Sequence, residues 1–257
     1  MTWMSRAGWS RVAIGPGIAV LTVACGGAAF ALGPAPIAHA KTAVSVASTL
    51  YVGNDDVSQG TVTPISTATN KPGKAIKVGQ SSLMIAVTPN GKTAYVANLN
   101  SATVTPISTA TNKPGKPIKA GSFPAWIAIT PNGKTAYVAD FNSNTVTPIA
   151  TATNKPGTPI KVGRQPWWIT ITPNGKTAYV ANENSATVTP ITTATNRAGK
   201  PITVGQGPAA SVVTPDGKTL YVANSLSDTV TPITTATNRA GKPIKVGIEP
   251  MWMAITP

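Results

Sequence analysis

The sequence has very little of the side-chain chemistry that most enzymes use. Among 257 residues it contains one cysteine, Cys25, and one histidine, His39, and it has seven Asp and Glu against 21 Lys and Arg. A Ser-His-Asp triad, a thiol nucleophile and a His- or Cys-ligated metal site all need residues that this chain nearly lacks. A single cysteine also excludes an intrachain disulfide, so packing has to hold the fold together. The composition therefore argues against an enzyme, and it predicts no cofactor and no metal site.

Charged residues make up only 11% of the chain and aromatic residues 5%, whereas the chain has 23 glycines and 24 prolines. So few charges and so many turn-forming residues argue against a bundle of long amphipathic helices. They favour short strands joined by many regular turns.

The first 40 residues have the layout of a secretory signal peptide. Arg6 and Arg11 precede an uncharged run over residues 12–32, and Ala38-His39-Ala40 places small residues where a signal peptidase cuts. We therefore predict cleavage after Ala40 and a secreted or cell-surface protein. Two alternatives remain open, because the run is long enough to stay as a membrane anchor and Cys25 is a possible lipid-attachment site. Membrane contact is expected only through this segment, if it is retained.

Residues 41–257 repeat one unit. The phrase TPNGKTAYVAN at residues 88–98 returns as TPNGKTAYVAD at 130–140, TPNGKTAYVAN at 172–182 and TPDGKTLYVAN at 214–224. The five tyrosines follow at intervals of 44, 42, 42 and 42 residues, as Tyr51, Tyr95, Tyr137, Tyr179 and Tyr221. A period near 42 is the length of one four-stranded blade of a β-propeller, and the amphipathic stretches of helical repeats are absent.

Each unit can be divided into four short strands, a to d. In the unit around Tyr137 they are predicted at residues 127–129, 136–139, 145–149 and 159–162. Pro-Asn-Gly before Lys134 predicts a tight turn from a to b, and residues 154–157 (NKPG) predict the turn from c to d. The proline of each TVTPI segment removes a backbone donor from strand c, so we expect a bulge between c and d there.

Such units have to stack on one another, because one sheet cannot cover both of its apolar faces. The series starts in a strand b, TLYVGN at residues 49–54, and stops in a strand a, MWMAITP at residues 251–257. This last strand could complete the first blade and close a ring of five blades; the alternative is a partial arc of a larger propeller. The predicted fold is therefore an all-β propeller of five blades over residues 41–257.

Several phrases resemble the repeat of the YVTN family of β-propeller proteins. They are TAYVAN, TVTPISTATNKPGKPIKAG and PAWIAITPNGKTAYVAD, and the likeness extends over residues 48–257. The resemblance implies an extracellular or cell-surface repeat protein, such as a surface-layer component. The family often has Asp just after strand c and commonly has seven blades. This chain instead has Ser66, Ser108, Ala150, Thr192 and Thr234 at that position.

In a propeller the a-to-b and c-to-d turns emerge on one face, which is predicted here to be strongly basic. Its one acid is Asp216, and its cations are Lys71, Lys74, Lys92, Lys113, Lys116, Lys134, Lys155, Lys176, Arg197, Lys200, Lys218, Arg239 and Lys242. One interpretation is binding of a polyanion such as teichoic acid or acidic polysaccharide, with Lys92, Lys134, Lys176 and Lys218 as candidate contacts. The other is a solvated face without a partner. Nucleic acid is not the expected partner, because these turns lack stacking aromatics.

The b-to-c and d-to-a loops form the other face, where the repeats differ. Its segments place Met84, Trp126, Trp168, Ala210 and Trp252 at one position of the repeat, with Trp167 beside Trp168. These side chains either fill the seams between blades or line a mildly acidic pocket at the mouth of the channel. A pocket would bind a sugar or a peptide segment through Trp126, Trp167, Trp168, Trp252, Asp140 and Glu183.

The predicted function is a non-enzymatic binding or scaffold module of the cell envelope, with a cell-wall polymer, a polysaccharide or a protein as its partner. The enzymatic alternative is a lactonase or lyase type of propeller that uses acidic residues of the second face. A polyanion-binding adhesin that uses the lysines is the third possibility. No catalytic residue is assigned.

Overall fold

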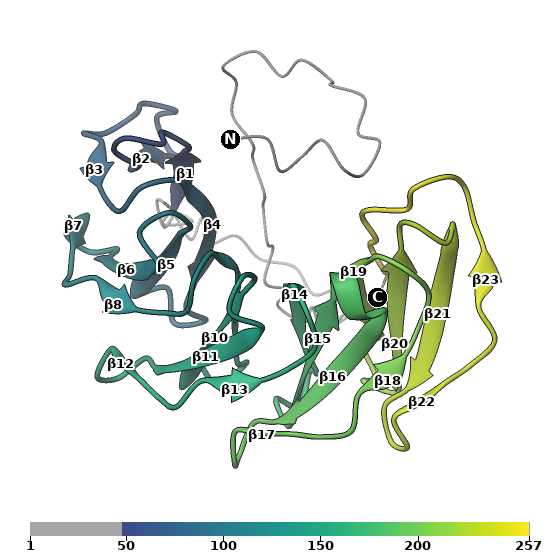
Figure 1. The fold of residues 1–257 in the computed structure, drawn as a ribbon. Helices are drawn as coiled ribbons and strands as arrows, with labels where there is room; N and C mark the ends of the chain where they lie inside the picture. The colour runs from purple at the N-terminus through teal and green to yellow at the C-terminus, as the bar shows by residue number, and fades with distance from the viewer. Residues whose placement is uncertain (1–47, 257) are drawn as a thin grey trace, which may run out of the picture.

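The computed structural model describes residues 48–256, and its regular structure is β-strand except for one short 3-10 turn (Figure 1). The strands form five antiparallel sheets, one for each sequence repeat. The predicted signal peptide, with Cys25 and His39, lies outside the described residues. Within residues 48–256 we find no helix with the length and apolar character needed to cross a membrane.

Sheets 2 to 5 share one plan: an inner strand, two middle strands and two short outer strands that both pair with the third strand. Sheet 1 lacks the inner strand and consists of β1 (Thr49–Asn54), β2 (Thr61–Ser66) and β3 (Ile76–Lys77). Sheet 2 consists of β4 (Ser82–Val87), β5 (Thr93–Asn98), β6 (Thr103–Ser108), β7 (Lys113–Pro114) and β8 (Ile118–Lys119). Sheet 3 consists of β9 (Pro124–Ile129), β10 (Thr135–Asp140), β11 (Thr145–Ala150), β12 (Lys155–Pro156) and β13 (Ile160–Lys161). Sheet 4 consists of β14 (Pro166–Ile171), β15 (Thr177–Asn182), β16 (Thr187–Thr192), β17 (Arg197–Ala198) and β18 (Ile202–Thr203), with η1 (Glu183–Ser185) in the connection from β15 to β16. Sheet 5 consists of β19 (Pro208–Val213), β20 (Thr219–Asn224), β21 (Thr229–Thr234), β22 (Arg239–Ala240) and β23 (Ile244–Lys245).

The Pro-Asn-Gly segment forms the predicted tight turn between the inner strand and the next. In sheet 3, Gly133 has a φ of +70°, which a glycine adopts without steric cost. Its N–H donates to the carbonyl of Thr130 at 2.7 Å. The side-chain oxygen of Asn132 accepts the N–H of Lys134 at 2.9 Å. The turn is therefore closed by the residues that the repeat copies.

The outer strand is interrupted at the proline, so the expected bulge is confirmed. In sheet 3, β12 pairs with the end of β11 and β13 pairs with its beginning, with one extra residue between the two registers. At the interruption, the N–H of Gly157 donates to the carbonyl of Pro148 at 2.7 Å. Carbonyl and nitrogen of a strand residue point the same way, so the nitrogen of Pro148 that lacks a hydrogen also faces the bulge.

The turn from c to d was predicted too late in the chain. It ends at Asn154, which has a φ of +55°, and Lys155 and Pro156 already belong to β12. Asparagine tolerates the left-handed conformation that reverses the chain here, so the Pro-Gly pair is not needed for the turn.

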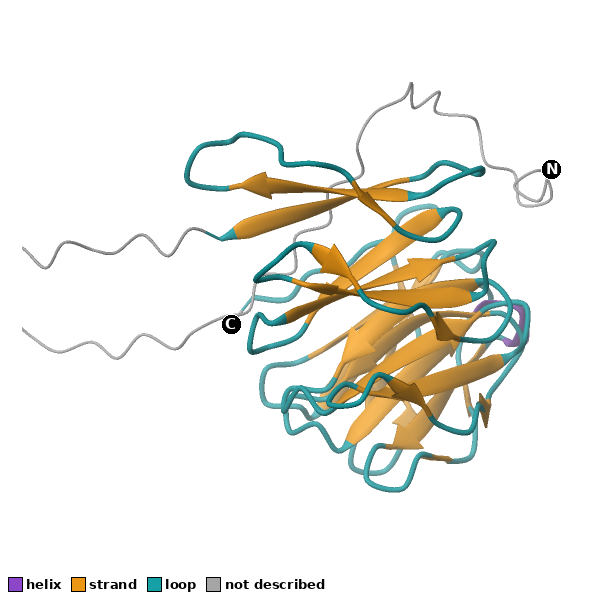
Figure 2. Cartoon of the chain, turned by 90° about the vertical axis from the view of Figure 1, so that its left-hand side faces the viewer, coloured by secondary structure: helices purple, strands orange, loops and turns teal. Residues whose placement is uncertain are grey.

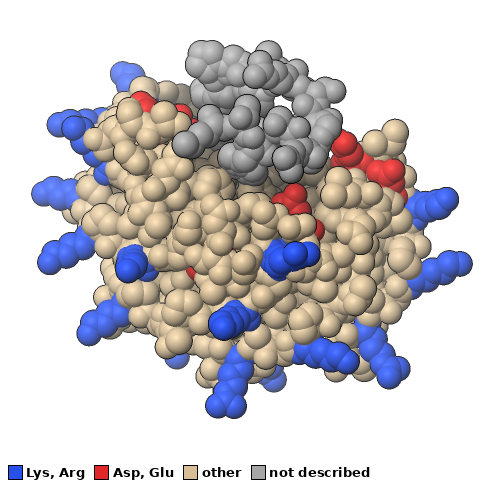
Figure 3. Space-filling model, in the orientation of Figure 1, with Lys and Arg blue, Asp and Glu red and all other residues tan. Residues whose placement is uncertain are grey.

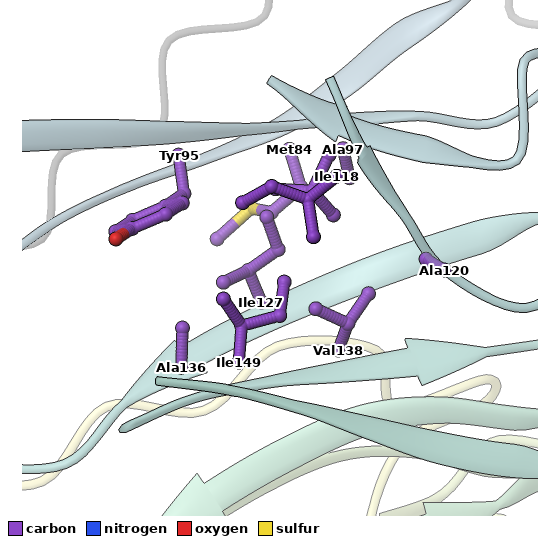
Figure 4. Packing of buried hydrophobic residues seen from close by; sticks show 10 residues of the cluster. Met84, Tyr95, Ala97, Ile118, Ala120, Ile127, Ala136, Val138 and Ile149 are labelled. Atoms are coloured by element: carbon purple, nitrogen blue, oxygen red, sulfur yellow. The ribbon is translucent and has the colours of Figure 1, made fainter. Parts of the chain in front are cut away.

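The core lies in the seams between neighbouring sheets. In the seam between sheets 2 and 3, Tyr95, Ala97 and Val104 pack against Ala136, Val138 and Ile149, and all are fully buried (Figure 4). The same positions repeat in the other seams. Burying one such aliphatic side chain contributes about 1.5–3 kcal/mol.

The sheets stack in chain order into an arc, with sheet 1 and sheet 5 at its two ends (Figure 1). The all-β fold of five propeller blades is confirmed. Closure through the C-terminal strand is not observed, because residues 251–256 form no strand and sheet 1 keeps three strands. In Figure 1 the C-terminal segment lies beside sheet 5, and β1 lies at the other end of the arc.

Candidate binding site on the inner strands

Hydrogen bonds sort the connections onto two faces, as propeller geometry predicts. The hydroxyl of Thr109, after β6, donates to the carbonyl of Gly91, before β5, at 2.6 Å, so the c-to-d and a-to-b turns lie together on what we call the turn face. On the opposite loop face, the N–H of Phe141, after β10, donates to the carbonyl of Phe123, before β9, at 2.9 Å. Figure 2 shows these connections at the two ends of the strands, with η1 marking the loop face.

Two of the predicted tryptophans stack on each other along the inner strands. Trp126 comes from β9 and Trp168 from β14, and their rings lie 3.5 Å apart between centroids, with 29° between the ring planes. Both are half-buried, because Trp126 also packs against the seams on either side of sheet 3. The seam-filling interpretation is therefore supported for Trp126, and the lining of a pocket at the mouth of the channel stays a prediction.

Trp168 is fixed in position by hydrogen bonds to the next inner strand. Its indole N–H lies 3.1 Å from both the carbonyl of Ser211 in β19 and the hydroxyl of Thr170. The Thr170 hydroxyl itself donates to the Ser211 carbonyl at 2.8 Å. A ring held in this way loses little freedom when a ligand stacks on it, which favours binding.

Trp252 joins the stack from the C-terminal segment. Its ring meets Trp168 edge to face, with 5.6 Å between centroids, and 65% of the residue is exposed. At the same repeat position, Met84 and Ala210 are buried at 7% and 2% exposure. The aromatic wall therefore covers sheets 3 and 4 and the C-terminal segment, which we call the tryptophan wall (Trp126, Trp168 and Trp252).

Trp167 belongs to a different cluster. It occupies the bulge of β14, between the residues where the register shifts. Its ring lies edge-on to Phe141, with 5.7 Å between centroids, and Phe141 lies 5.8 Å from Phe123. Sequence reasoning missed the two phenylalanines, although their places in the variable loop segments were a signal that could have revealed them.

Asp140 is buried and points into its own sheet. It is 0% exposed, and its Oδ2 accepts hydrogen bonds from the hydroxyls of Thr147 at 2.6 Å and Thr145 at 3.1 Å. Burial raises the pKa of Asp140 to about 6, although the threonine hydroxyls oppose this shift. Asn98, Asn182 and Asn224 occupy the same position and donate to the matching threonines. The structure thus places Asp140 in a repeated internal contact and does not bring it to the tryptophan wall.

Glu183 lies on the loop face, in the short turn η1 that follows β15. The side chain is half-buried, and burial raises the pKa of its carboxyl group. Its backbone N–H donates to the carbonyl of Gln165 at 3.0 Å. Glu183 therefore lies where a b-to-c loop and a d-to-a loop meet. Within residues 48–256, no contact is resolved between Glu183 and the tryptophans of the wall.

The four predicted polyanion-binding lysines are all exposed on the turn face. These are Lys92, Lys134, Lys176 and Lys218. Within the described residues one ion pair is formed, between Lys218 and Asp216 at 3.5 Å, where both side chains are largely exposed. In Figure 3 the basic side chains project from the rim and from the visible face, and most of them are separated by uncharged surface. This spacing favours many weak contacts over one focused anion site.

Two surface grooves lie at the outer ends of seams and away from the tryptophan wall. One has a volume of about 350 Å³ between sheets 1 and 2, and the other about 590 Å³ between sheets 4 and 5. Each is lined by a Gly-Lys pair of the c-to-d segments, Gly73 and Lys74 in the first and Gly199 and Lys200 in the second. Across residues 48–256 no three His, Cys, Asp or Glu side chains gather in a way that could hold a metal ion.

Comparisons with solved structures support the fold. The chain is similar to Kuenenia stuttgartiensis hydrazine synthase, with 29% identity and a TM-score of 0.59 over 63% of this chain and 48% of that one. It therefore spans about half the length of that chain. A functionally unknown protein from Desulfotomaculum acetoxidans has 24% identity and a TM-score of 0.64, over 79% of this chain and 70% of that one.

A candidate 6-phosphogluconolactonase from Bacteroides uniformis has 18% identity and a TM-score of 0.66, over 82% of this chain and 72% of that one. At this level of identity the likeness shows the propeller fold alone. Comparisons with protein-family models and with curated proteins find no match.

Proposed function

We propose that the chain is a secreted, non-enzymatic propeller of the YVTN type that binds a cell-envelope component on its tryptophan wall. The observation that carries this proposal is the stack of Trp126 on Trp168 with the exposed Trp252 beside it. Three large aromatic side chains lie together on one surface, and one of them is 65% exposed. Single exposed apolar residues are common on protein surfaces, whereas a contiguous apolar patch marks an interaction site. Aromatic surfaces with a few fixed polar groups are typical of ligand sites.

The chemistry of the wall favours a ligand that has flat apolar faces and hydrogen-bond acceptors. Sugar rings of a cell-wall polysaccharide and extended peptide segments both have these features. Trp252 supplies an accessible ring, and Trp168 supplies a ring whose orientation is fixed by Ser211. The signal-like first 40 residues and the repeat phrases support an envelope location.

A second candidate function rests on the turn face, where the lysines have Asp216 as their one acidic partner in the described structure. Polyanion binding through such a face would weaken steeply as salt rises, because it depends on released counterions. Binding at the tryptophan wall depends on apolar contact and would change little.

The test is cosedimentation of the purified protein with cell-wall polymer, measured at low and high salt. We expect Trp252→Ala to weaken binding about tenfold, which corresponds to about 1.4 kcal/mol. Trp167→Ala is the matched control, because it removes a tryptophan outside the wall, and binding should be unchanged. A combined Lys92, Lys134 and Lys176 to Ala variant tests the turn face.

The outcomes separate the candidates. Salt-insensitive binding that is lost with Trp252→Ala supports the wall, whereas binding that is lost only with the lysine variant supports polyanion recognition. Hydrolysis of 6-phosphogluconolactone or another lactone by the purified protein would contradict the non-enzymatic proposal.

A further inference from the structure

Three of the four turns between an inner strand and the next strand contain an Asn-Gly pair. The pairs are Asn90-Gly91, Asn132-Gly133 and Asn174-Gly175, and the sequence contains no other Asn-Gly pair. All three asparagines are exposed on the turn face. An asparagine followed by glycine loses its amide most easily, because glycine has no side chain to hinder the attack of its nitrogen on the asparagine side chain.

The turn also polarises the amide group that would react. In sheet 3, Oδ1 of Asn132 accepts the hydroxyl of Thr130 at 2.8 Å and the N–H of Lys134 at 2.9 Å. The turns of sheets 2 and 4 repeat both bonds. Two donors on this oxygen stabilise the negative charge that develops there when a nucleophile attacks Cγ. Within residues 48–256, no hydrogen bond of the three side-chain nitrogens is found, so the amide nitrogen can leave into solvent.

One hydrogen bond restrains the attacking nitrogen. The N–H of Gly133 donates to the carbonyl of Thr130 at 2.7 Å, so this bond has to open before the nitrogen can attack. The two bonds to Oδ1 of Asn132 do not involve this nitrogen. An exposed turn opens locally at a cost far below that of global unfolding. The folded protein should therefore react more slowly than the unfolded chain, but at a measurable rate.

The turn of sheet 5 shows that a carboxylate fits this position. Asp216 replaces the asparagine, and its Oδ1 accepts the hydroxyl of Thr214 at 2.6 Å and the N–H of Lys218 at 3.0 Å. Gly217 keeps the left-handed conformation of the other turns, with a φ of +73°. The hydroxyl of Thr214 and the N–H of Lys218 lower the pKa of Asp216, so the group is ionised at neutral pH. Replacing the amide by a carboxylate thus preserves the turn.

The carboxylate of Asp216 also engages the lysine of its own turn. Its Oδ2 lies 3.5 Å from Nζ of Lys218. Lys92, Lys134 and Lys176 hold the same place in the other three turns, and within residues 48–256 they have no acidic partner. Lys218 is therefore a model, within the same chain, for the state that the other three lysines would reach after loss of the neighbouring amide.

We propose that Asn90, Asn132 and Asn174 are sites of spontaneous deamidation, and that each aspartate formed pairs with the lysine two residues later. The nitrogen of the following glycine forms a bond to Cγ, the bond from Cγ to Nδ2 breaks, and the side-chain nitrogen leaves as ammonia with the glycine proton. Water then opens the cyclic imide. Opening at the side-chain carbonyl gives aspartate, and opening at the backbone carbonyl gives isoaspartate. Both products carry a carboxylate, so each event adds one negative charge to the turn face.

The consequence for ligand binding rests on the second candidate function, polyanion recognition by the turn face. A lysine that is paired within its own turn is less available to an anionic polymer, and the added charge repels the polymer. Affinity should therefore fall as the protein ages. The modification and its charge are measured without a ligand, so their failure is distinguishable from a failure of polyanion binding.

Peptide mass mapping of the purified protein, incubated at mildly alkaline pH and physiological temperature, tests the three sites. We expect the peptides with the Asn-Gly pairs to gain the mass of an amide-to-acid conversion, and the aged protein to elute earlier from a cation exchanger. The internal controls are Asn112, Asn154 and Asn196, which are exposed on the same face and accept a tyrosine hydroxyl but precede Lys or Arg. These three should stay intact.

Two results of the mapping would overturn the proposal. One is equal conversion of the Asn-Gly pairs and the control asparagines. The other is no conversion of the Asn-Gly pairs over a period many times longer than the urea-unfolded protein needs.

Asn132→Asp tests the ion pair, because it introduces the product directly in a turn that accepts Asp216 in sheet 5. We expect the pKa of the introduced carboxyl, followed by NMR, to rise when Lys134→Met is added, since the methionine keeps the length of the side chain without its charge. The same pKa with and without Lys134→Met would contradict the pairing.

Inorganic polyphosphate is the probe for the effect on binding. The combined Asn90, Asn132 and Asn174 to Asp variant should bind it about threefold or more weakly than the wild type at low salt. Asp216→Asn, which removes the carboxylate already present, should bind it more tightly. Equal affinities of the combined variant and the wild type would contradict the masking of the lysines. If the wild type does not bind polyphosphate, the second candidate function fails, and the mass mapping still decides the modification.

Discussion

The hydroxyl of Tyr137 donates a 2.6 Å hydrogen bond to Oδ1 of Asn196, and this bond joins sheet 3 to sheet 4 on the turn face. Burial raises the pKa of Tyr137 to about 12, so the hydroxyl stays protonated and remains a donor at neutral pH. The tyrosine that makes each repeat recognisable is therefore the residue that ties each repeat to the next one.

We predict that Tyr137→Phe destabilises the protein by about 1–2 kcal/mol, since it removes a hydrogen bond and leaves the Asn196 oxygen without this donor. Urea unfolding followed by circular dichroism measures the change. Tyr221→Phe is the matched control, because no bond of its hydroxyl is found among the described residues, and it should cost less than about 0.5 kcal/mol in dilute solution. Equal losses for the two variants would contradict the role of the Tyr-Asn bond.

Gly163, in the connection from β13 to β14, gives a second prediction with an internal control. Gly163→Ala would place a Cβ 2.7 Å from the Cβ and Cγ of Asn182, so we expect a loss of about 1–3 kcal/mol from overpacking. Gly247→Ala is the same change at the same position of sheet 5, where a Cβ meets nothing within 4 Å. The thermal midpoint of the Gly247→Ala variant, measured at low protein concentration, should stay close to that of the wild type.

Much of the fold is predictable from sequence because the repeat encodes it locally. The Pro-Asn-Gly turn, the strands around Tyr137 and the bulge at Pro148 each depend on residues that are close in the chain. Closure of the ring was less predictable, because it depends on the stacking angle of every seam and no single residue determines that angle.

The candidate site was predicted less well, for reasons that concern strand geometry. Trp167 and Trp168 are neighbours in sequence, yet the bulge at Trp167 and strand alternation send them to different clusters. The charge of Asp140 suggests a ligand-binding residue, whereas Asn98 and Asn182 at the same repeat position indicate a structural role.

A buried left-handed alanine gives a prediction of increased stability. Ala186 has φ 51° and ψ 42°, a conformation that is strained for alanine and tolerated by asparagine. Asn144 holds the same position in sheet 3, and its Oδ1 accepts the N–H of Gln165 at 2.8 Å. Ala186→Asn should therefore stabilise the protein by about 0.5–1 kcal/mol. Asn144→Ala should destabilise it by a similar amount, and the same sign for both variants would contradict the explanation.

Asp140 should make the stability of the protein depend on pH. Its pKa is raised by burial from an ordinary 3.8 to about 6, so the folded state holds this proton more tightly than the unfolded chain does. The contribution of Asp140 to stability is complete below about pH 4 and is lost as pH rises through about 6, with a total loss of about 3 kcal/mol.

Asp140→Asn restores the residue found in sheets 2, 4 and 5, where the amide donates to threonine hydroxyls. We expect the variant to be more stable than the wild type at pH 7 by up to this amount and to match it more closely near pH 4. Urea midpoints measured from pH 4 to pH 8 check the prediction, and Asn182→Asp, which introduces the same buried carboxyl in sheet 4, should show a larger fall in stability with pH. Parallel curves for the wild type and Asp140→Asn would show that this carboxyl does not set the pH dependence.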